Sequence, residues 1–228
     1  MGCDPRSRTC GGDILEAYAR IRRYRRDEEI YGAEEPADSW YRVVSGVARK
    51  FAVQSDGRRR IVDFLLPGDF FGFTALSHHH FSVEAVLEDT MIASYARDPL
   101  EALALTDPRL GRTLSAIACS VITRLQSRIL IFGGVTAQAK VALFLREMAA
   151  RSQAETADQV FLLPMSRYDI ADYLALSVET VSRALTRLRR CGAIALVGRN
   201  GVRIADLQLT SDGPAPAPPA PDGPQALS

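Results

Sequence analysis

The stretch from Ser166 to Gly192 constrains this chain most, because it reads as two short helices with a tight turn between them. Ser166 and Asp169 have the spacing of a capping box, in which the hydroxyl and the carboxylate each cover a free backbone N–H at a helix start. A first helix is therefore predicted to begin there. Ala175 interrupts the helical pattern, Ser177 is well suited to cap a second helix, and Gly192 is placed to end it.

The second predicted helix has two faces, whose centres lie roughly 140° apart at 100° per residue. Val178, Val181, Leu185 and Leu188 form the apolar face, and Glu179, Ser182, Arg183 and Thr186 form the polar one. A polar face of this kind suits the DNA major groove, where arginine binds O6 and N7 of guanine and glutamate accepts from N4 of cytosine. The spacing alone leaves open an ordinary solvated face with an ion pair between Glu179 and Arg183.

Length and charge set wider bounds. A chain of 228 residues, 47% of them hydrophobic, can bury a sizeable core as one large domain or two small ones. The net charge of +1 does not indicate a nucleic-acid partner, but residues 166–203 hold seven arginines against three acidic residues, as a phosphate-facing surface would. The lack of a bilayer-length apolar run or a signal peptide predicts a cytoplasmic protein with no membrane partner.

The cysteines and histidines give little sign of a metal site. Four scattered cysteines argue against a disulfide framework. Cys3 and Cys10 are poorly spaced for a metal and have no histidine nearby, and the consecutive residues 78–80, all histidine, are better explained as a polar loop tip. Cys191 is the one redox candidate near the predicted DNA surface, although buried structural filler is the favoured interpretation.

The N-terminal half changes from helical to β-rich patterning. Residues 1–12 are expected to form a flexible arm, and residues 13–26 a short helix. Short strands separated by glycine turns then predict an antiparallel roll or sandwich, with the whole domain spanning residues 13–106. The strands are expected at 41–44, 47–53, 61–66, 81–87 and 91–95, the turns at 45–46, 55–57 and 67–69, and Phe70, Phe71 and Phe73 in the core or lining a pocket.

Cap and proline pairs mark the helices that follow. Asp98 should begin a short helix, and Asp107 with Pro108 a long one that ends at Gly133. A helix of about 24 residues is near 36 Å long, more than one small β-domain covers, so its apolar stripe is expected to face a second copy. The alternative is a purely intramolecular helix. The stripe comprises Leu110, Leu114, Ile117, Val121 and Leu125.

The C-terminal part is predicted to hold one more helix and a hairpin around the two-helix stretch. Thr136 can cap a helix whose core face is Val141, Phe144, Leu145 and Met148, with a glycine hinge at 133–134 before it. Residues 193–197 and 202–205 should pair as a hairpin. The predicted segments are thus 107–133 for the long helix, 134–209 for a DNA-binding domain and 210–228 for a disordered tail rich in proline and alanine.

With this order of elements, two motifs carry a family resemblance. D-G-R-R-R-I-V-D-F-L-L-P-G-D-F-F-G-F resembles the β-roll signature of the CRP/FNR regulators, and E-T-V-S-R-A-L-T-R-L the recognition helix of their FNR/FixK branch. The resemblance implies an α+β fold: a β-roll like that of cyclic-nucleotide-binding domains, a long dimerisation helix and a winged helix-turn-helix. It implies no enzyme but a homodimeric transcription regulator, an activator partnered by double-stranded DNA and RNA polymerase, that reads a palindromic TTG-N8-CAA-type site.

The resemblance also assigns site residues. Those expected to read bases are Glu179, Ser182 and Arg183, and those expected at the DNA backbone are Ser166, Arg167, Ser177, Thr180, Thr186 and Arg199. Ala175 stands where many members have glycine, so the turn is strained if its φ is positive.

Departures from the family pattern are equally informative. Where cyclic-nucleotide-binding members have Gly-Glu and Arg-Ser pairs, this chain has Gly72-Phe73 and Phe81-Ser82, so a bound phosphate would lack its cation. Cys3 and Cys10 are too few for an iron–sulfur cluster. A FixK-like regulator without cofactor or metal is therefore expected. The alternative is an effector-gated regulator whose β-roll binds an unidentified small ligand.

Overall fold

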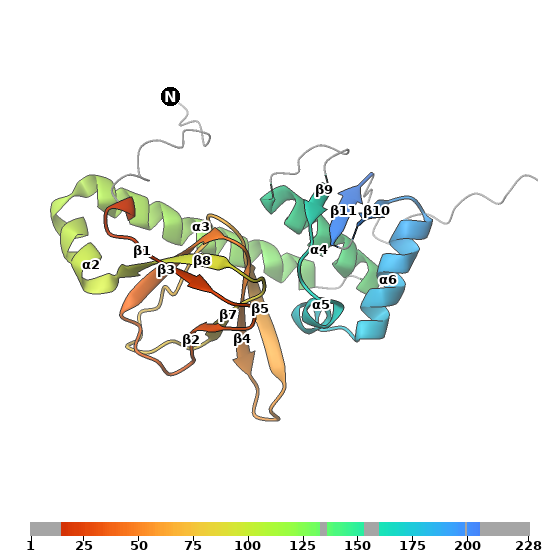
Figure 1. The fold of residues 1–228 in the computed structure, drawn as a ribbon, viewed down its shortest axis with the longest axis horizontal. Coiled ribbons are helices and arrows are strands. Elements are labelled where there is room, and N and C mark those ends of the chain that lie inside the picture. The colour runs from red at the N-terminus through yellow and green to blue at the C-terminus, as the bar shows by residue number, and fades with distance from the viewer. Residues whose placement is uncertain (1–14, 133–135, 153–159, 199, 206–228) are drawn as a thin grey trace, which may run out of the picture. The chain divides into compact units, whose positions relative to one another are not determined.

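The protein is described by a computed structural model that covers residues 15–132, 136–152, 160–198 and 200–205 (Figure 1). Two compact units are distinguished: residues 1–133 with 164–175, and residues 134–163 with 176–228. Within the described ranges, no helix combines the length and the hydropathy needed to cross a membrane. The predicted arm at 1–12, glycine hinge at 133–134 and tail at 210–228 lie outside the described residues.

The first unit is built on two four-stranded antiparallel sheets. The first sheet has the order β1 (Arg20–Tyr24), β8 (Thr90–Ala96), β3 (Ser39–Ser45), β6 (Phe70–Phe71), and the second β2 (Glu29–Tyr31), β7 (Ser82–Ala85), β4 (Ala48–Val53), β5 (Arg59–Leu65). Inward side chains of both sheets, among them Val43, Leu65 and Ile92, form one buried cluster. The predicted antiparallel β-roll is confirmed, and each of the five predicted strands is present.

The hairpin between β4 and β5 turns where its sequence predicted. Gly57 has φ +78°, a conformation that glycine adopts without steric cost, and its N–H donates to the carbonyl of Gln54 at 2.9 Å. Local turn chemistry therefore sets the register of these two strands.

The helix predicted over residues 13–26 is wrong for most of its described length. Only Leu15 and Glu16 are helical, and Arg20–Tyr24 forms β1, which pairs with β8 so that Ile21 lies opposite Ala93. Tyr24 is buried, whereas the four residues before it are exposed, as an edge strand allows. The helical pattern of this segment rested on only a few apolar residues, so pairing with the edge of β8 decided its structure instead.

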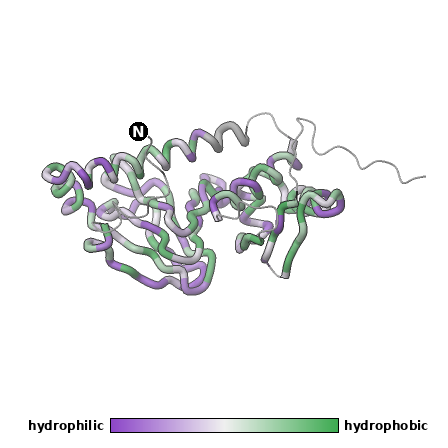
Figure 2. Tube along the Cα trace, turned by 90° about the horizontal axis from the view of Figure 1, so that it is seen from above, coloured by the Kyte–Doolittle hydropathy of each residue, from purple (hydrophilic) through white to green (hydrophobic). Residues whose placement is uncertain are grey.

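Two helices complete the first unit's N-terminal part. α2 (Arg97–Thr106) begins one residue before the expected Asp98, and its N-cap, Ala96, makes no side-chain hydrogen bond. α3 (Pro108–Phe132) has 25 residues and starts at the predicted proline. Along α3, hydrophilic and hydrophobic residues alternate (Figure 2).

The second unit holds the remaining elements except α5 (Arg167–Leu174), which belongs to the first. α4 (Ala137–Arg151) begins as predicted, with the Thr136 hydroxyl accepting from the N–H of Ala139 at 3.2 Å, and its four predicted core residues are buried. α6 (Val178–Arg190) precedes the predicted hairpin, β10 (Ile194–Val197) and β11 (Gly201–Ile204). The third strand beside β11, β9 (Val160–Leu162), was not predicted.

The histidine run is only partly a polar loop tip. His78 and His80 are exposed, but His79 is 3% exposed and stacks on Tyr31 with 3.8 Å between ring centroids. Tyr41 and Phe71 extend this aromatic cluster. The polar-tip prediction is therefore wrong for His79, because its ring packs against Tyr31 of β2 and Tyr41 of β3.

Candidate nucleic-acid interface

The start of α5 is fixed by the capping box that its sequence predicted. The Ser166 hydroxyl accepts from the N–H of Asp169 at 3.1 Å, and Asp169 Oδ2 accepts from the N–H of Ser166 at 3.1 Å. Ala175 ends the helix in the left-handed region, with φ +55° and ψ +47°. That conformation costs a residue with a Cβ about 1–2 kcal/mol, so the turn is strained as the sequence suggested.

α6 has the two faces that its spacing predicted. The Ser177 hydroxyl caps it by accepting from the N–H of Thr180 at 3.1 Å. The apolar face is buried, with Val181 and Leu188 at 0% exposure, whereas Glu179 and Arg183 are exposed. The face that the sequence assigns to base reading is therefore accessible.

A cationic groove of about 420 Å³ follows this outward face. Ser182, Arg183, Thr186, Arg187 and Arg190 line it. Arg187 and Arg190 were not predicted as site residues, although their spacing of four and then three residues from Arg183 places them on the same face. The groove is suited to a polyanion, since three guanidinium groups stand along one helix with Glu179 as its sole acidic residue.

The Arg183 side chain does not form the ion pair with Glu179 that was the alternative interpretation of this face. Among the residues that the structure covers, no salt bridge joins it to Glu179, and its Nη2 donates to the Thr180 hydroxyl at 3.4 Å. The interpretation of this face as a self-paired helix surface is thus not what the structure shows. Both charged groups remain available to an external partner.

The residues expected at the DNA backbone differ in how their side chains are engaged. Ser166 and Ser177 cap helices, and the Thr186 hydroxyl donates to the carbonyl of Ser182 at 2.9 Å. Arg167 is exposed at the first position of α5. Arg199 lies outside the described residues.

Cys191 follows α6 directly as its C-cap. The residue is exposed, and its thiol donates to the carbonyl of Leu188 at 3.3 Å. The burial expected of a structural cysteine is therefore not found, and the redox role of Cys191 stays a prediction. Gly192, with φ +75°, turns the chain away from the helix as predicted.

The apolar stripe of α3 is divided between two surroundings. Leu110 is fully buried in its own unit, and Leu114 and Ile117 pack against the same cluster, so Leu110 cannot also face a second copy. Further along, Leu125 is 38% exposed and the unpredicted Ile122 is 53% exposed. The stripe is covered by its own chain at the start and uncovered towards its end.

Comparisons with known proteins agree with this arrangement. The cyclic nucleotide-binding domain family matches residues 21–107, and the Crp-like helix-turn-helix domain family matches residues 139–209. The nitrogen fixation regulation protein FixK of Azorhizobium caulinodans is 42% identical over 185 residues, which are 80% of this chain and 74% of that protein. This chain belongs to the CRP/FNR family of transcription regulators.

Other CRP/FNR members extend the comparison. The structure of FixK2 from Bradyrhizobium japonicum superposes with a TM-score of 0.75 at 40% identity, covering 82% of this chain and 93% of that one. The transcriptional activator protein FnrL of Cereibacter sphaeroides is 31% identical over 197 residues, which are 84% of this chain and 79% of that protein. The chain is thus a FixK/FNR-type transcription regulator with a helix-turn-helix DNA-binding domain, and not an enzyme.

Two positions that the family resemblance assigns to a cyclic-nucleotide pocket carry aromatic residues in this chain. Where cyclic-nucleotide-binding members have a glutamate and an arginine, Phe73 and Phe81 stand instead. The Phe73 ring packs on Trp40, with 5.1 Å between centroids, and the Ser82 hydroxyl already accepts from a backbone N–H at 2.9 Å. Phe73 is thus part of an aromatic contact and supplies no carboxylate.

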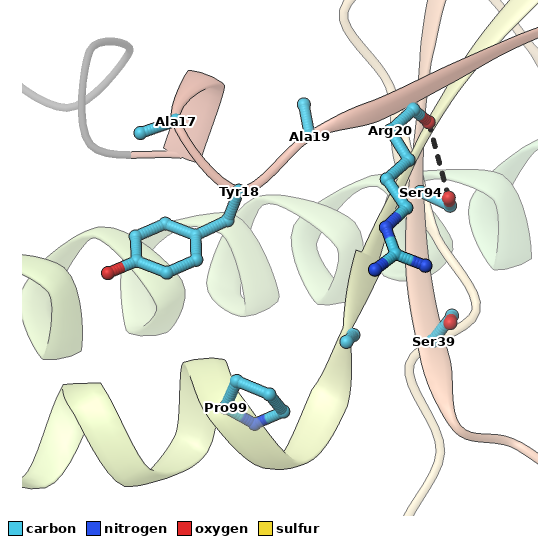
Figure 3. Close-up of a pocket in the computed structure, with 8 residues that line it drawn as sticks. Ala17, Tyr18, Ala19, Arg20, Ser39, Ser94 and Pro99 are labelled. Atoms are coloured by element: carbon cyan, nitrogen blue, oxygen red, sulfur yellow. Dashed lines mark hydrogen bonds between the residues drawn. The ribbon is translucent and has the colours of Figure 1, made fainter.

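A separate cavity of about 340 Å³ lies where β1, β3 and β8 meet the start of α2 (Figure 3). The side chains that line it are mostly small, and Arg20 is its one charged residue. The Ser94 hydroxyl donates to the backbone carbonyl of Arg20 at 3.2 Å, and the Arg20 side chain is the cationic group at this cavity.

Proposed function

We propose that this regulator is a homodimeric, sequence-specific transcription activator that reads a palindromic TTG-N8-CAA-type site. The observation that carries the proposal is the accessible cationic groove of α6, in which Arg183 is free of ion pairing. FixK and FnrL, by their names, are a regulator and an activator, which supports the class of function. Its partners are double-stranded DNA and RNA polymerase, in the cytoplasm.

Base reading falls to three residues of α6. Arg183 donates to O6 and N7 of a guanine in each half-site, and Glu179 accepts from the amino group of the paired cytosine. Ser182 lies between them on the same face and contacts a neighbouring base edge. These assignments follow from exposure and spacing on one helix.

We assign contacts with DNA phosphates to residues other than these three. Arg167, Arg199 and the unpredicted Arg187 and Arg190 supply cations, and the capped helix starts supply backbone N–H groups beside Ser166, Ser177 and Thr180. Thr186 lines the groove, so its hydroxyl oxygen can still accept or its methyl can pack, although its proton is donated within the helix.

The dimer contact uses the uncovered end of the α3 stripe. Val121, Ile122 and Leu125 form its centre, with Leu114 and Ile117 at its margin and Leu110 excluded by burial. Parallel pairing of two such helices gives a two-fold axis, which matches a palindromic site.

No effector is required for activity in this proposal. The misfit of the nucleotide pocket supports it, because Phe73 and Phe81 offer neither a carboxylate for ribose nor a cation for phosphate. Cys3 and Cys10 are too few to hold an iron–sulfur cluster.

Binding-site selection on the purified protein tests the proposal. We expect a palindrome whose half-site centres lie about one helical turn, roughly 34 Å, apart. Recovery of a non-palindromic motif, or of no motif, would contradict the proposed site and its two-fold reader.

Sedimentation tests the dimer separately. Val121→Glu combined with Leu125→Glu should yield folded monomers, because neither side chain belongs to the fully buried core. Leu105→Glu, at an 89% exposed position on α2, is the matched control and should remain dimeric. A wild type that is monomeric at micromolar concentration and on DNA would rule the dimer out.

An effector-gated regulator is the second candidate, favoured by the cavity beside Arg20 (Figure 3). A thermal-shift screen with haem, cyclic nucleotides and 2-oxoglutarate separates the two, since a specific ligand raises the melting temperature by mass action. The effector-free proposal expects no shift. A saturable shift that is lost in Arg20→Gln would favour gating.

A further inference from the structure

Two arginines of the β-roll donate hydrogen bonds to Asp169, the capping residue of α5, which is the first helix of the helix-turn-helix motif. Arg49 of β4 and Arg59 of β5 both donate to Asp169 Oδ1, through Nη1 at 3.2 Å and Nη2 at 2.8 Å. The same two arginines donate to Glu84 Oε1 of β7, at 2.5 Å and 2.8 Å. Two guanidinium groups and two carboxylates thus form one closed cluster, which we call the latch.

The latch is largely shielded from water. The side chains of Asp169, Arg49 and Glu84 are 5%, 9% and 16% exposed, and that of Arg59 is 30% exposed. Burial lowers the pKa of Arg49, but the hydrogen bond to Glu84 and the charge of Asp169 outweigh it and raise the pKa overall. A buried cluster of this kind depends on each member, because removing one leaves an uncompensated charge in a poorly solvated place.

The two carboxylate oxygens of Asp169 bind different partners. Oδ2 accepts from the N–H and the hydroxyl of Ser166 at the start of α5, whereas Oδ1 accepts from both β-roll arginines. One carboxylate therefore both starts α5 and fixes it to the sheet. An ordinary capping box, with its acid in water, would lack the second connection.

Further contacts reinforce this docking of α5. Arg59 Nε lies 3.8 Å from Asp172 Oδ2, one turn along the helix, and the Tyr173 ring meets Phe64 of β5 with 5.2 Å between centroids. Arg49 also donates to Asp27 at 2.7 Å. α5 is thus held by charge at its start and by ring packing near its end.

The residues that form the latch all belong to the first unit, whereas the residues proposed to read DNA lie on α6 of the second unit. Glu179 and Arg183 are exposed in the same structure in which Asp169 is 4% exposed as a residue. The effect of the latch must lie in holding α5, the helix that leads through Ala175 into α6.

We propose that Arg49, Arg59 and Glu84 are positioning residues for DNA binding, which preorganise α5 through Asp169 so that the regulator needs no effector to hold its helix-turn-helix motif. This inference rests on the proposed function. The cluster supplies from the chain's own residues the order that a bound ligand would otherwise have to impose. Loosening it should lower the affinity for every DNA sequence and leave the base preference intact.

DNA affinity of a double-mutant cycle tests the latch. Arg59→Gln and Asp169→Asn should each weaken binding to the selected site by about fivefold or more, the lower range of coupling between sites. Asparagine keeps an acceptor for the Ser166 N–H, so Asp169→Asn removes the charge and retains the cap. Because both changes break the same contact, the double variant should bind about as well as the weaker single variant.

Arg58→Gln is the matched control. It removes the same charge one residue away, from an exposed arginine whose recorded ion pair is with Asp56 at 3.6 Å, and should bind like the wild type. Equal losses in Arg58→Gln and Arg59→Gln, wild-type affinity in Arg59→Gln, or multiplied losses in the double variant would each overturn the proposal. If Arg59→Gln fails to fold, Arg59→Lys replaces it, with an intermediate loss expected and wild-type affinity contradicting the latch.

Hydrogen exchange without DNA separates failure of the latch from failure of the proposed function. In Arg59→Gln, amide protection should fall in α5 and stay unchanged in α4, because the latch holds only the former. Unchanged protection of α5 would overturn the latch whatever the DNA result. A wild type that selects no palindrome but shows the change in α5 would instead count against the proposed function alone.

Discussion

Arg124 of α3 places its Nη2 atom 3.4 Å from Oδ2 of Asp63 on β5, a carboxylate whose side chain is only 1% exposed. The same guanidinium bonds Asp69 in the turn after β5. A long helix and a sheet are thus joined by a cation between two acids. The Arg124 side chain, itself 18% exposed, is largely withdrawn from water.

Replacing Arg124 with glutamine should lower the free energy of unfolding by about 3 kcal/mol, because it leaves the buried Asp63 carboxylate without this cation. Urea denaturation followed by circular dichroism measures the change. Arg112→Gln, at an exposed position of the same helix, should stay within about 0.5 kcal/mol of the wild type. Equal stability of the two variants would show that the Arg124 contact contributes nothing.

Removing the Arg183 side chain should cost about 1–3 kcal/mol per half-site and flatten discrimination at one base pair. Competition binding with single-base variants of the selected site gives both quantities. Arg189→Ala, a change at an exposed arginine that does not line the groove, should preserve the base preference. An Arg183→Ala variant with the wild-type preference would move base reading to other residues.

Ala175→Gly should stabilise the protein by about 0.5–1 kcal/mol, because glycine adopts the left-handed conformation of this turn without the Cβ penalty. Thermal unfolding detects the gain as a higher melting temperature. Ala171→Gly makes the same chemical change inside α5 and should instead destabilise by about 1 kcal/mol. Loss of stability in both variants would mean that the turn is not strained.

His79 should make stability depend on pH in the mildly acidic range. Burial lowers its pKa, while Glu35 and Asp38 oppose the shift, so the folded state resists a proton that the unfolded state accepts. Stability should therefore fall as the pH drops below about 6.5, the ordinary histidine value. His79→Phe, which can keep the stack on Tyr31, should flatten the profile between about pH 7 and pH 5, whereas His80→Phe at an exposed position should not. Identical profiles for both variants would exclude His79 as the cause.

Predictions were correct where a structure depends on interactions between residues that are close in sequence. The Ser166 and Asp169 capping box, the Thr136 and Ser177 caps and the Gly57 turn all form as predicted, because each rests on hydrogen bonds or backbone angles within four residues. The two faces of α6 follow likewise from helical period. These signals, with the two motifs, were enough to indicate the fold and the helix that we propose reads DNA.

The predictions that failed concern residues whose structure depends on partners elsewhere in the fold. Arg20–Tyr24 forms β1 because it pairs with β8, and the His79 ring is buried against Tyr31 and Tyr41 from two other strands. Leu110 was predicted at the dimer contact, but it packs against residues of the β-roll at the start of α3 and is buried there.

The sequence by itself determined most of the helices and strands, the helix caps at Thr136, Ser166 and Ser177, the exposed polar face of α6 and the family. Only the tertiary structure decided which charges meet: Asp169, readable as a cap, also receives Arg49 and Arg59 from more than a hundred positions away. The physical reason is range. Caps, turns and helical faces depend on neighbours along the chain, whereas buried ion pairs depend on where the sheets bring distant side chains together.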